Sequence, residues 1–265
     1  MLRLMIVKII RWLLVKLGRG GSLPGNIGLK MDSQLLSRFK MPKHVILVTG
    51  TNGKTTTSNL IVESLLASGM KVIGNRRGDN LREGIATLLC ANSDLHYRVK
   101  ADAVVLEVDE LTIPRVFDQL PVSAFVVNNF FRDQLDRAGE METIVRKIES
   151  VLPDYHGKLI LNGNDPNVVR LADCAKQAEV LYFDVKQCAV SLSDSHEASE
   201  GKFCPRCGGE LHYDYYQYSH IGQFSCPRDG FGRHEAAVCV ESIDFNTQTM
   251  VVNAQTLPMF QNAIY

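Results

Sequence analysis

The stretch Val48-Thr-Gly-Thr-Asn-Gly-Lys-Thr-Thr-Thr57 decides the fold of this 265-residue chain. An apolar run leads into it and a helical pattern begins at its lysine, which indicates a strand, a glycine-rich turn and a helix. Glycines let backbone amides curl around an anion, and the helix N-terminus adds a partial positive charge. The stretch therefore predicts a phosphate-binding loop, made of Gly50, Thr51, Asn52, Gly53, Lys54, Thr55 and Thr56.

Two side chains of this loop have expected roles. In phosphate loops the lysine contacts the β- and γ-phosphates of a nucleotide, and the hydroxyl that follows it binds Mg²⁺. We therefore expect Lys54 to bind ATP and Thr55 to hold magnesium. The alternative is an ordinary strand–turn–helix with a surface lysine. The common phosphate-loop spacing has a glycine where this chain has Val48, so the loop is a variant of that motif.

Outward from the loop, short β-branched runs alternate with helical periods. This alternation predicts an α/β fold with a mostly parallel sheet and right-handed crossovers. A later pair of strands, around a short polar turn, predicts a hairpin that returns to the sheet. The expected strands are 44–49, 103–108, 122–127, 158–161 and 179–183, the helices 54–66, 81–90, 140–152 and 165–174, and the hairpin 238–245 with 249–254.

The N-terminal segment 1–40 differs from the rest, which we expect to form a main domain over residues 41–265. Residues 2–17 predict a basic amphipathic helix, with Lys8, Arg11, Lys16 and Arg19 on one arc, followed by a Gly/Pro linker. The helix either lies in the headgroup layer of an anionic membrane or packs on the protein with its cations in water. It is not expected to span a bilayer, which needs about 20 apolar residues.

Composition narrows the class of protein. Lys plus Arg and Asp plus Glu both number 29, so no net basic field exists to attract nucleic acid. The seven cysteines are an odd number without the spacing of a disulfide framework, which suits a reducing cytosol. The N-terminus lacks the pattern of a signal peptide. We expect a cytoplasmic protein, with peripheral contact at the inner face of the membrane if its first helix binds lipid.

A cysteine-rich insertion over residues 200–235 interrupts the α/β pattern. Cys204-Pro-Arg-Cys207 and Cys226-Pro-Arg-Asp229 form two knuckles separated by 18 residues, the arrangement of a zinc ribbon. Asp229 stands where a fourth cysteine is usual, and a carboxylate is a harder ligand than a thiolate. His220 and His234 are alternative fourth ligands. The competing interpretation is a metal-free ribbon held by its tyrosines.

The sequence resembles the Mur ligase and folylpolyglutamate synthase family, whose phosphate loops share the pattern at 49–56. In that family the residue that matches Glu107 helps to hold magnesium. The stretch 128–137 resembles another family segment, but Gln134 replaces a histidine that supports a second metal. The turn 161–166, with Asp165, resembles one that lies close to the nucleotide. The resemblance implies an ATP-binding Mur ligase central domain, with ATP and Mg²⁺ as cofactors.

Three features resemble one amidating branch of that family: the stretch Gly18-Arg-Gly-Gly-Ser-Leu-Pro-Gly25, the loop Asn75-Arg-Arg-Gly-Asp-Asn80 and the cysteine insertion. In the loop, Asn75, Arg76 and Asn80 are candidates for contact with nucleotide or substrate. The resemblance implies amidation of the α-carboxyl of D-glutamate in lipid II, with ammonia from a GatD-type glutamine amidotransferase partner. The alternatives are an amino-acid-adding Mur or folylpolyglutamate-type ligase and a non-catalytic ATP-binding fragment.

The family's catalytic residues are expected in a C-terminal domain that closes over ATP. We expect this chain to stop before that domain, so the sequence names no catalytic acid or base. Because acyl transfer requires the carboxylate, the γ-phosphate and the ammonia to be enclosed together, we expect the chain to be inactive alone.

Overall fold

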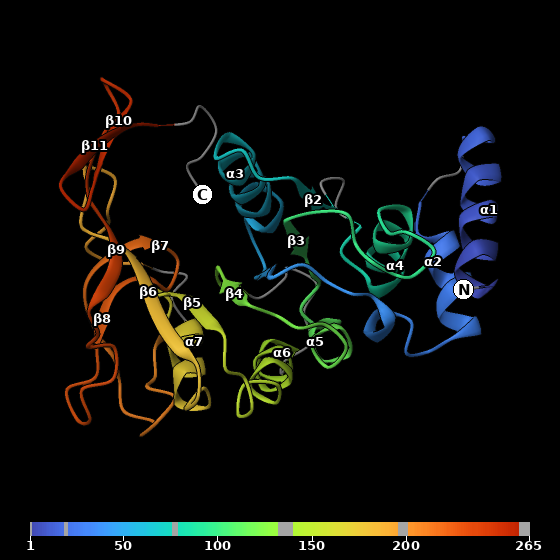
Figure 1. Ribbon diagram of the computed structural model, residues 1–265. Helices are drawn as coiled ribbons and strands as arrows, with labels where there is room; N and C mark the ends of the chain where they lie inside the picture. Colours follow the sequence, from blue (N-terminus) through green and yellow to red (C-terminus); the bar gives the residue numbers. More distant parts are fainter. Residues whose placement is uncertain (1, 19–20, 76–78, 132–139, 196–200, 260–265) are drawn as a thin grey trace. The chain divides into compact units, whose positions relative to one another are not determined.

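The computed structural model describes residues 2–18, 21–75, 79–131, 140–195 and 201–259. They belong to two compact units, Met1–Val126 and Val127–Tyr265, and Figure 1 shows their elements. The N-terminal segment packs into the first unit. The domain boundary expected after residue 40 stays a prediction. Strand β4 (Ala124–Val127) spans the division between the units.

Strands β1 (His44–Thr49), β2 (Val72–Gly74) and β3 (Ala103–Glu107) of the first unit pair in parallel. Strand β3 pairs with β1 on one edge and with β2 on the other. Every residue of β3 is buried, as its apolar run predicts for a central parallel strand. The register places Val48 opposite Glu107, so the end of β3 lies beside the start of the phosphate loop. The strands predicted at 44–49 and 103–108 are confirmed, whereas β2 was not predicted.

A layer of three helices covers part of this unit. Helix α2 (Leu23–Met31) packs against both α1 (Leu2–Lys16) and α4 (Arg82–Ala91). A Cβ atom on Gly25 would lie 1.9 Å from the carbonyl oxygen of Glu83, so only glycine allows this approach of α2 to α4. The predicted helix at 2–17 is confirmed, and the one at 81–90 corresponds to α4.

The expected Gly/Pro linker needs correction. Its last residues belong to α2, which begins at Leu23 and carries Pro24 in its first turn. Proline is tolerated there because the first N–H groups of a helix have no intrahelical partner to lose. The glycine and proline that suggested a break in the chain therefore start a helix and pack it against its neighbour.

Of the cations expected on one arc of α1, Lys8 does not face outward, and Arg19 lies outside the described residues. Lys8 turns into the protein, where its Nζ donates to the carbonyl oxygens of Cys90 and Ser93, each at 2.6 Å. These carbonyls lie at the C-terminal end of α4, where a cation is favoured by the helix dipole. Burial lowers the pKa of Lys8. The neighbouring side chains of Leu4 and Val7 are buried against the unit, so the inner face of α1 is packed on the protein, although Lys8 is not in water as that interpretation expected.

The second unit contains a mixed arrangement of strands. Strands β5 (Lys158–Asn162), β6 (Glu179–Val185) and β9 (Ala236–Asp244) pair in parallel in that order, and β9 continues into antiparallel β10 (Thr249–Val252). The predicted strands and hairpin are confirmed. A further strand, β11 (Gln255–Pro258), extends the hairpin and was not predicted.

Strands β7 (His212–Tyr218) and β8 (Ile221–Ser225) form a separate antiparallel pair inside the expected insertion. The helix predicted at 165–174 is shorter than expected, because its one α-helical turn gives way to a 3-10 turn. The remaining elements are the 3-10 helix η1 (Leu36–Arg38), the helices α3 (Lys54–Ala67), α5 (Ile113–Phe117), α6 (Glu140–Glu149) and α7 (Pro166–Val169), and the 3-10 helix η2 (Arg170–Asp173).

Candidate nucleotide site and metal cluster

The phosphate loop has the predicted strand–turn–helix form. Gly53 caps the N-terminus of α3 with a φ of +76°, and Gly50 has a φ of +131°. Both values lie in regions that side chains disfavour, so the loop requires glycine at these two positions. Lys54 folds back over the turn, where its Nζ donates to the carbonyl oxygens of Gly50 at 2.5 Å and Thr51 at 3.2 Å.

Lys54 also pairs with an acid that the sequence analysis did not assign. Its Nζ lies 3.0 Å from Oε1 of Glu110, and the two side chains are only 14% and 10% exposed. Burial raises the pKa of Glu110, while the charge of Lys54 opposes that rise. The sequence indicates this ion pair only by the position of Glu110, which follows Glu107 by three residues.

The residues predicted to hold magnesium lie together. Thr55 at the start of α3 donates its hydroxyl to Oε2 of Glu107 at 2.8 Å, and Asn80 donates to the other carboxylate oxygen at 3.2 Å. The carboxylate belongs to a residue that is 2% exposed, at the end of β3. A hydroxyl and a carboxylate are the oxygen ligands that Mg²⁺ prefers, so these residues fit the ion chemically.

Asn75 serves the backbone of this site. Its side chain accepts from the backbone N–H of Glu107 at 2.8 Å and donates to the carbonyl oxygen of the same residue at 2.7 Å. A second donation, to the carbonyl oxygen of Asp79, holds the loop that carries Asn80. Asn75 therefore positions the end of β3, and its side-chain amide is engaged by backbone. Arg76 lies outside the described residues, as do 133–137, which include Gln134.

Asp165 lies in the second unit and has a capping role. It is fully buried, and its carboxylate accepts from the backbone N–H groups of Asn167 at 2.8 Å and Phe130 at 2.9 Å. Nε2 of His220, also fully buried, lies 3.4 Å from Oδ1 of Asp165. The side chain of Asp165 thus caps α7 and fixes the turn before it. The expected position of this turn near the nucleotide stays a prediction.

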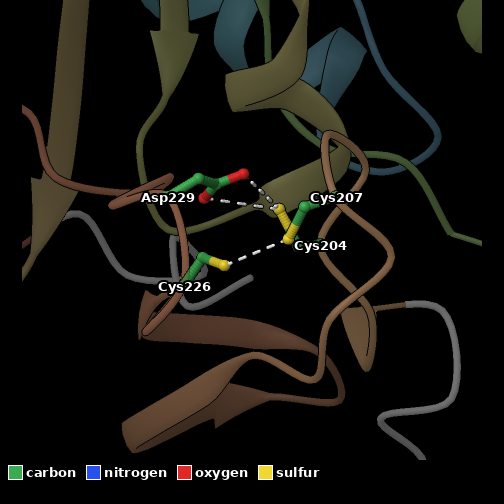
Figure 2. A group of neighbouring side chains, drawn as sticks. All are labelled: Cys204, Cys207, Cys226 and Asp229. Carbon is green, nitrogen blue, oxygen red and sulfur yellow. Dashed lines mark hydrogen bonds between the residues drawn. The ribbon is translucent and has the colours of Figure 1, made fainter.

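The four candidate zinc ligands converge in the second unit (Figure 2). The ligand atoms of Cys204, Cys207, Cys226 and Asp229 all lie within 4.8 Å of one another. The sulfurs of Cys207 and Cys226 are 3.5 Å apart, and the sulfur of Cys204 lies 3.4 Å from Oδ2 of Asp229. Zinc–sulfur bonds of about 2.3 Å at tetrahedral angles place two sulfurs about 3.8 Å apart. In these two pairs the ligand atoms are therefore spaced nearly as they are in a tetrahedral zinc site.

The two knuckles are structural copies of each other. The carbonyl oxygen of Cys204 accepts from Gly208 at 2.9 Å, and that of Cys226 accepts from Gly230 at 3.0 Å. Both glycines have a positive φ, at +68° and +72°. In this repeat Asp229 occupies the position that Cys207 has in the first knuckle, which explains how a carboxylate reaches the cluster.

Asp229 is the fourth member of the group, whereas the two histidines face other acids. His234 lies 3.0 Å from Asp184, and His220 lies beside Asp165. A hydrogen bond from the backbone N–H of Phe231 is the main cause that lowers the pKa of Asp229 to about 2, so its carboxylate is ionised. Three thiols and one carboxylate are ligands that fit Zn²⁺. The structure brings together the same four residues that the sequence predicts as ligands.

We expect Glu110→Gln to remove a pH-dependent part of the stability. Because the pKa of Glu110 is raised in the folded protein, its contribution is fully present below the ordinary value of 4.5 and is lost as pH rises through the raised pKa. The free energy of unfolding of the parent should therefore fall relative to that of Glu110→Gln over this interval. Urea unfolding at a series of pH values measures the difference. If the stability of the parent instead rises with pH relative to that of the variant, the charge of Lys54 affects the pKa of Glu110 more than burial does.

Comparisons with known proteins show the family of this chain. The Mur ligase middle domain matches residues 48–225. Relatives from two species carry the name lipid II isoglutaminyl synthase (glutamine-hydrolyzing) subunit MurT. The one from Staphylococcus aureus is 37% identical over 85% of this chain and 50% of its own length, and the one from Streptococcus pneumoniae is 34% identical over 84% and 49%. The chain thus spans about half the length of these curated relatives.

A solved structure shows the same fold. A pseudomurein peptide ligase type C from Methanothermus fervidus has a TM-score of 0.61 and 22% identity, over 84% of this chain and 43% of its own. The agreement confirms the mostly parallel α/β fold. The middle-domain match begins at Val48, in the strand that leads into the phosphate loop, and covers most of the chain. This chain therefore belongs to the Mur ligase family and resembles its MurT subunits.

Proposed function

We propose that this chain supplies the ATP-binding part of an enzyme that amidates the α-carboxyl of D-glutamate in the lipid II stem peptide. The observation that carries the proposal is the phosphate loop, in which Lys54 lies over the turn and Thr55 contacts the carboxylate of Glu107. The names of the MurT relatives support the amidation of lipid II as the reaction.

The chemistry requires activation of the carboxylate. A carboxylate oxygen attacks the γ-phosphorus of ATP, ADP leaves, and an acyl phosphate forms. The nitrogen of ammonia then attacks the carbonyl carbon, the bond from that carbon to the phosphate oxygen breaks, and phosphate leaves with the electron pair while the nitrogen gives up a proton to water. Magnesium would neutralise charge on the phosphates.

The chain's own residues would serve the first of these steps. Lys54 would leave Glu110 and turn to the β- and γ-phosphates, where its charge opposes the negative charge of the transferred group. Thr55 and Glu107 would hold the metal ion at the loop. Asn75 would keep the end of β3 in place while this happens, since it binds both backbone groups of Glu107.

Ammonia would come from a partner. The relatives are described as a subunit of a glutamine-hydrolysing enzyme, which supports a GatD-type glutamine amidotransferase as the second subunit. Such a pair would work on the cytoplasmic side, where ATP and the lipid-linked precursor meet.

We expect the protein, at the full length that its gene encodes and with its amidotransferase, to lower the mass of lipid II by the change from carboxyl to carboxamide. Mass spectrometry after incubation with Mg-ATP and glutamine measures this, and free ammonia should replace glutamine. Lys54→Ala should form no product. A mass increase by an amino-acid residue would instead assign the chain to the amino-acid-adding ligases. The absence of product with both nitrogen sources would contradict the proposed amidation.

A further inference from the structure

The outward face of α1 is apolar. Leu2, Met5, Ile9, Trp12 and Leu13 are exposed, with Trp12 at 56% and Ile9 at 50%. At 100° per residue these five side chains fall within one arc, opposite the buried side chains of the same helix. A helix that packs on a protein normally turns its apolar stripe inward, so a second apolar stripe in water indicates that something else covers it.

The charge of the N-terminal segment indicates what covers the apolar face of α1. Residues 1–31 contain six Lys and Arg and no Asp or Glu, in a chain whose total charges balance at 29 and 29. On the outward face Lys16 lies over the ring of Trp12, 3.8 Å from its centroid. An apolar face with cations at its side matches a layer that is apolar inside and anionic at its surface.

A second copy of the chain fits this face less well. Two such faces packed together would bring together two segments that carry only positive charges, with no acid on either to compensate. A lipid surface supplies both the anions and the apolar interior. Helix α1 has 15 residues, and in the described part of the chain no helix is long and apolar enough to cross a membrane.

We propose that α1 binds the surface of an anionic bilayer, lying in its plane with the side chains of Leu2, Met5, Ile9, Trp12 and Leu13 inserted among the acyl chains. The inner face of the helix stays packed on the first unit through Leu4, Val7 and Lys8. Binding thus needs no unfolding of the unit. The ring of Trp12 would reach the acyl chains from the boundary with the headgroups, which is the position that its amphipathic ring favours.

Trp12 makes the test direct, because it is the only tryptophan of the chain. We expect its fluorescence to shift to shorter wavelength with vesicles of phosphatidylglycerol and phosphatidylcholine, and to be quenched by brominated acyl chains. Vesicles of phosphatidylcholine alone should give a weaker shift, and high salt should weaken the anionic case. No shift and no co-sedimentation with the anionic vesicles would overturn the proposal.

A pair of matched variants tests the face itself. Ile9→Glu should weaken vesicle binding by about tenfold or more, since a buried isoleucine contributes a factor of that size. Leu66→Glu makes a similar apolar-to-acidic change at an exposed position of α3 and should bind as the parent does. Circular dichroism confirms that both variants fold. Equal binding by the two variants would contradict the proposal, as would a fluorescence shift that depends on protein concentration without vesicles, which would assign the face to a second copy.

Discussion

Lys54→Ala should abolish measurable binding of Mg-ATP. The ammonium lies over the turn of the phosphate loop, within 3.2 Å of two of its carbonyl oxygens. Charge-assisted hydrogen bonds to phosphate contribute about 1.5–3 kcal/mol each, so the loss of the lysine should weaken binding by about a hundredfold or more. Isothermal titration calorimetry measures the change. Unchanged affinity would show that the loop does not bind phosphate through this side chain.

The control for this variant must separate binding from folding. Lys54→Ala leaves the mostly buried carboxyl of Glu110 without its partner, which costs stability in addition to ligand contacts. The double variant Lys54→Ala with Glu110→Gln removes that uncompensated charge, and we expect it to fold better than the single variant yet still fail to bind ATP. Lys71→Ala changes an exposed lysine of the same unit and should leave ATP binding unaltered.

Cys226→Ser should cost the chain its zinc and much of the stability of the second unit. The thiol of Cys226 is fully buried beside Phe224 and Phe231, at the base of the cluster. We expect about one zinc ion per chain in protein purified without chelator, because the four ligands fit a closed structural site. Loss of such a site costs about 3 kcal/mol or more, since metal binding there is coupled to folding. Elemental analysis and thermal unfolding measure the two effects.

Two further variants define the zinc site. Cys174→Ser changes a free cysteine of the same unit outside the cluster, and it should keep both the metal and the stability. Asp229→Cys should keep the metal and bind it more tightly, because thiolate is the softer ligand and the second knuckle already has the backbone of the first. Zinc-free parent protein, or equal zinc in parent and Cys226→Ser, would support the metal-free ribbon.

The parts of the fold that were predictable are those that depend on local pattern. The strand before the loop, the loop and the start of α3 are contiguous, and glycines at positions 50 and 53 are required by the backbone itself. The cysteine knuckles are likewise defined by neighbours in sequence. In the phosphate loop and the knuckles, the residues that favour the local backbone structure lie next to, or are themselves, the candidate ligand-binding residues.

The parts that were missed depend on contacts between distant residues. Glu110 meets Lys54 only because β3 ends beside the loop, and Lys8 reaches the end of α4 only because α1 packs there. Asp165 likewise accepts from the distant backbone N–H of Phe130 and lies beside His220, and the sequence of its turn predicts neither contact. Helical periodicity correctly predicts that Lys8 lies on a helix. It does not predict which face of that helix packs against the first unit.

The packing of Lys8 and Gly25 has a practical consequence for anyone who trims this protein for expression or crystallisation. The first 31 residues resemble a detachable leader, yet deleting them would strip the ammonium from the carbonyls of Cys90 and Ser93 and uncover the surface of α4 that α2 approaches through Gly25. A shortened protein would therefore lose attachment to lipid and structural support together, and its behaviour would say little about either. Single substitutions on the outward face of α1 leave the packing of the first unit intact. They change only the side chains that this helix exposes.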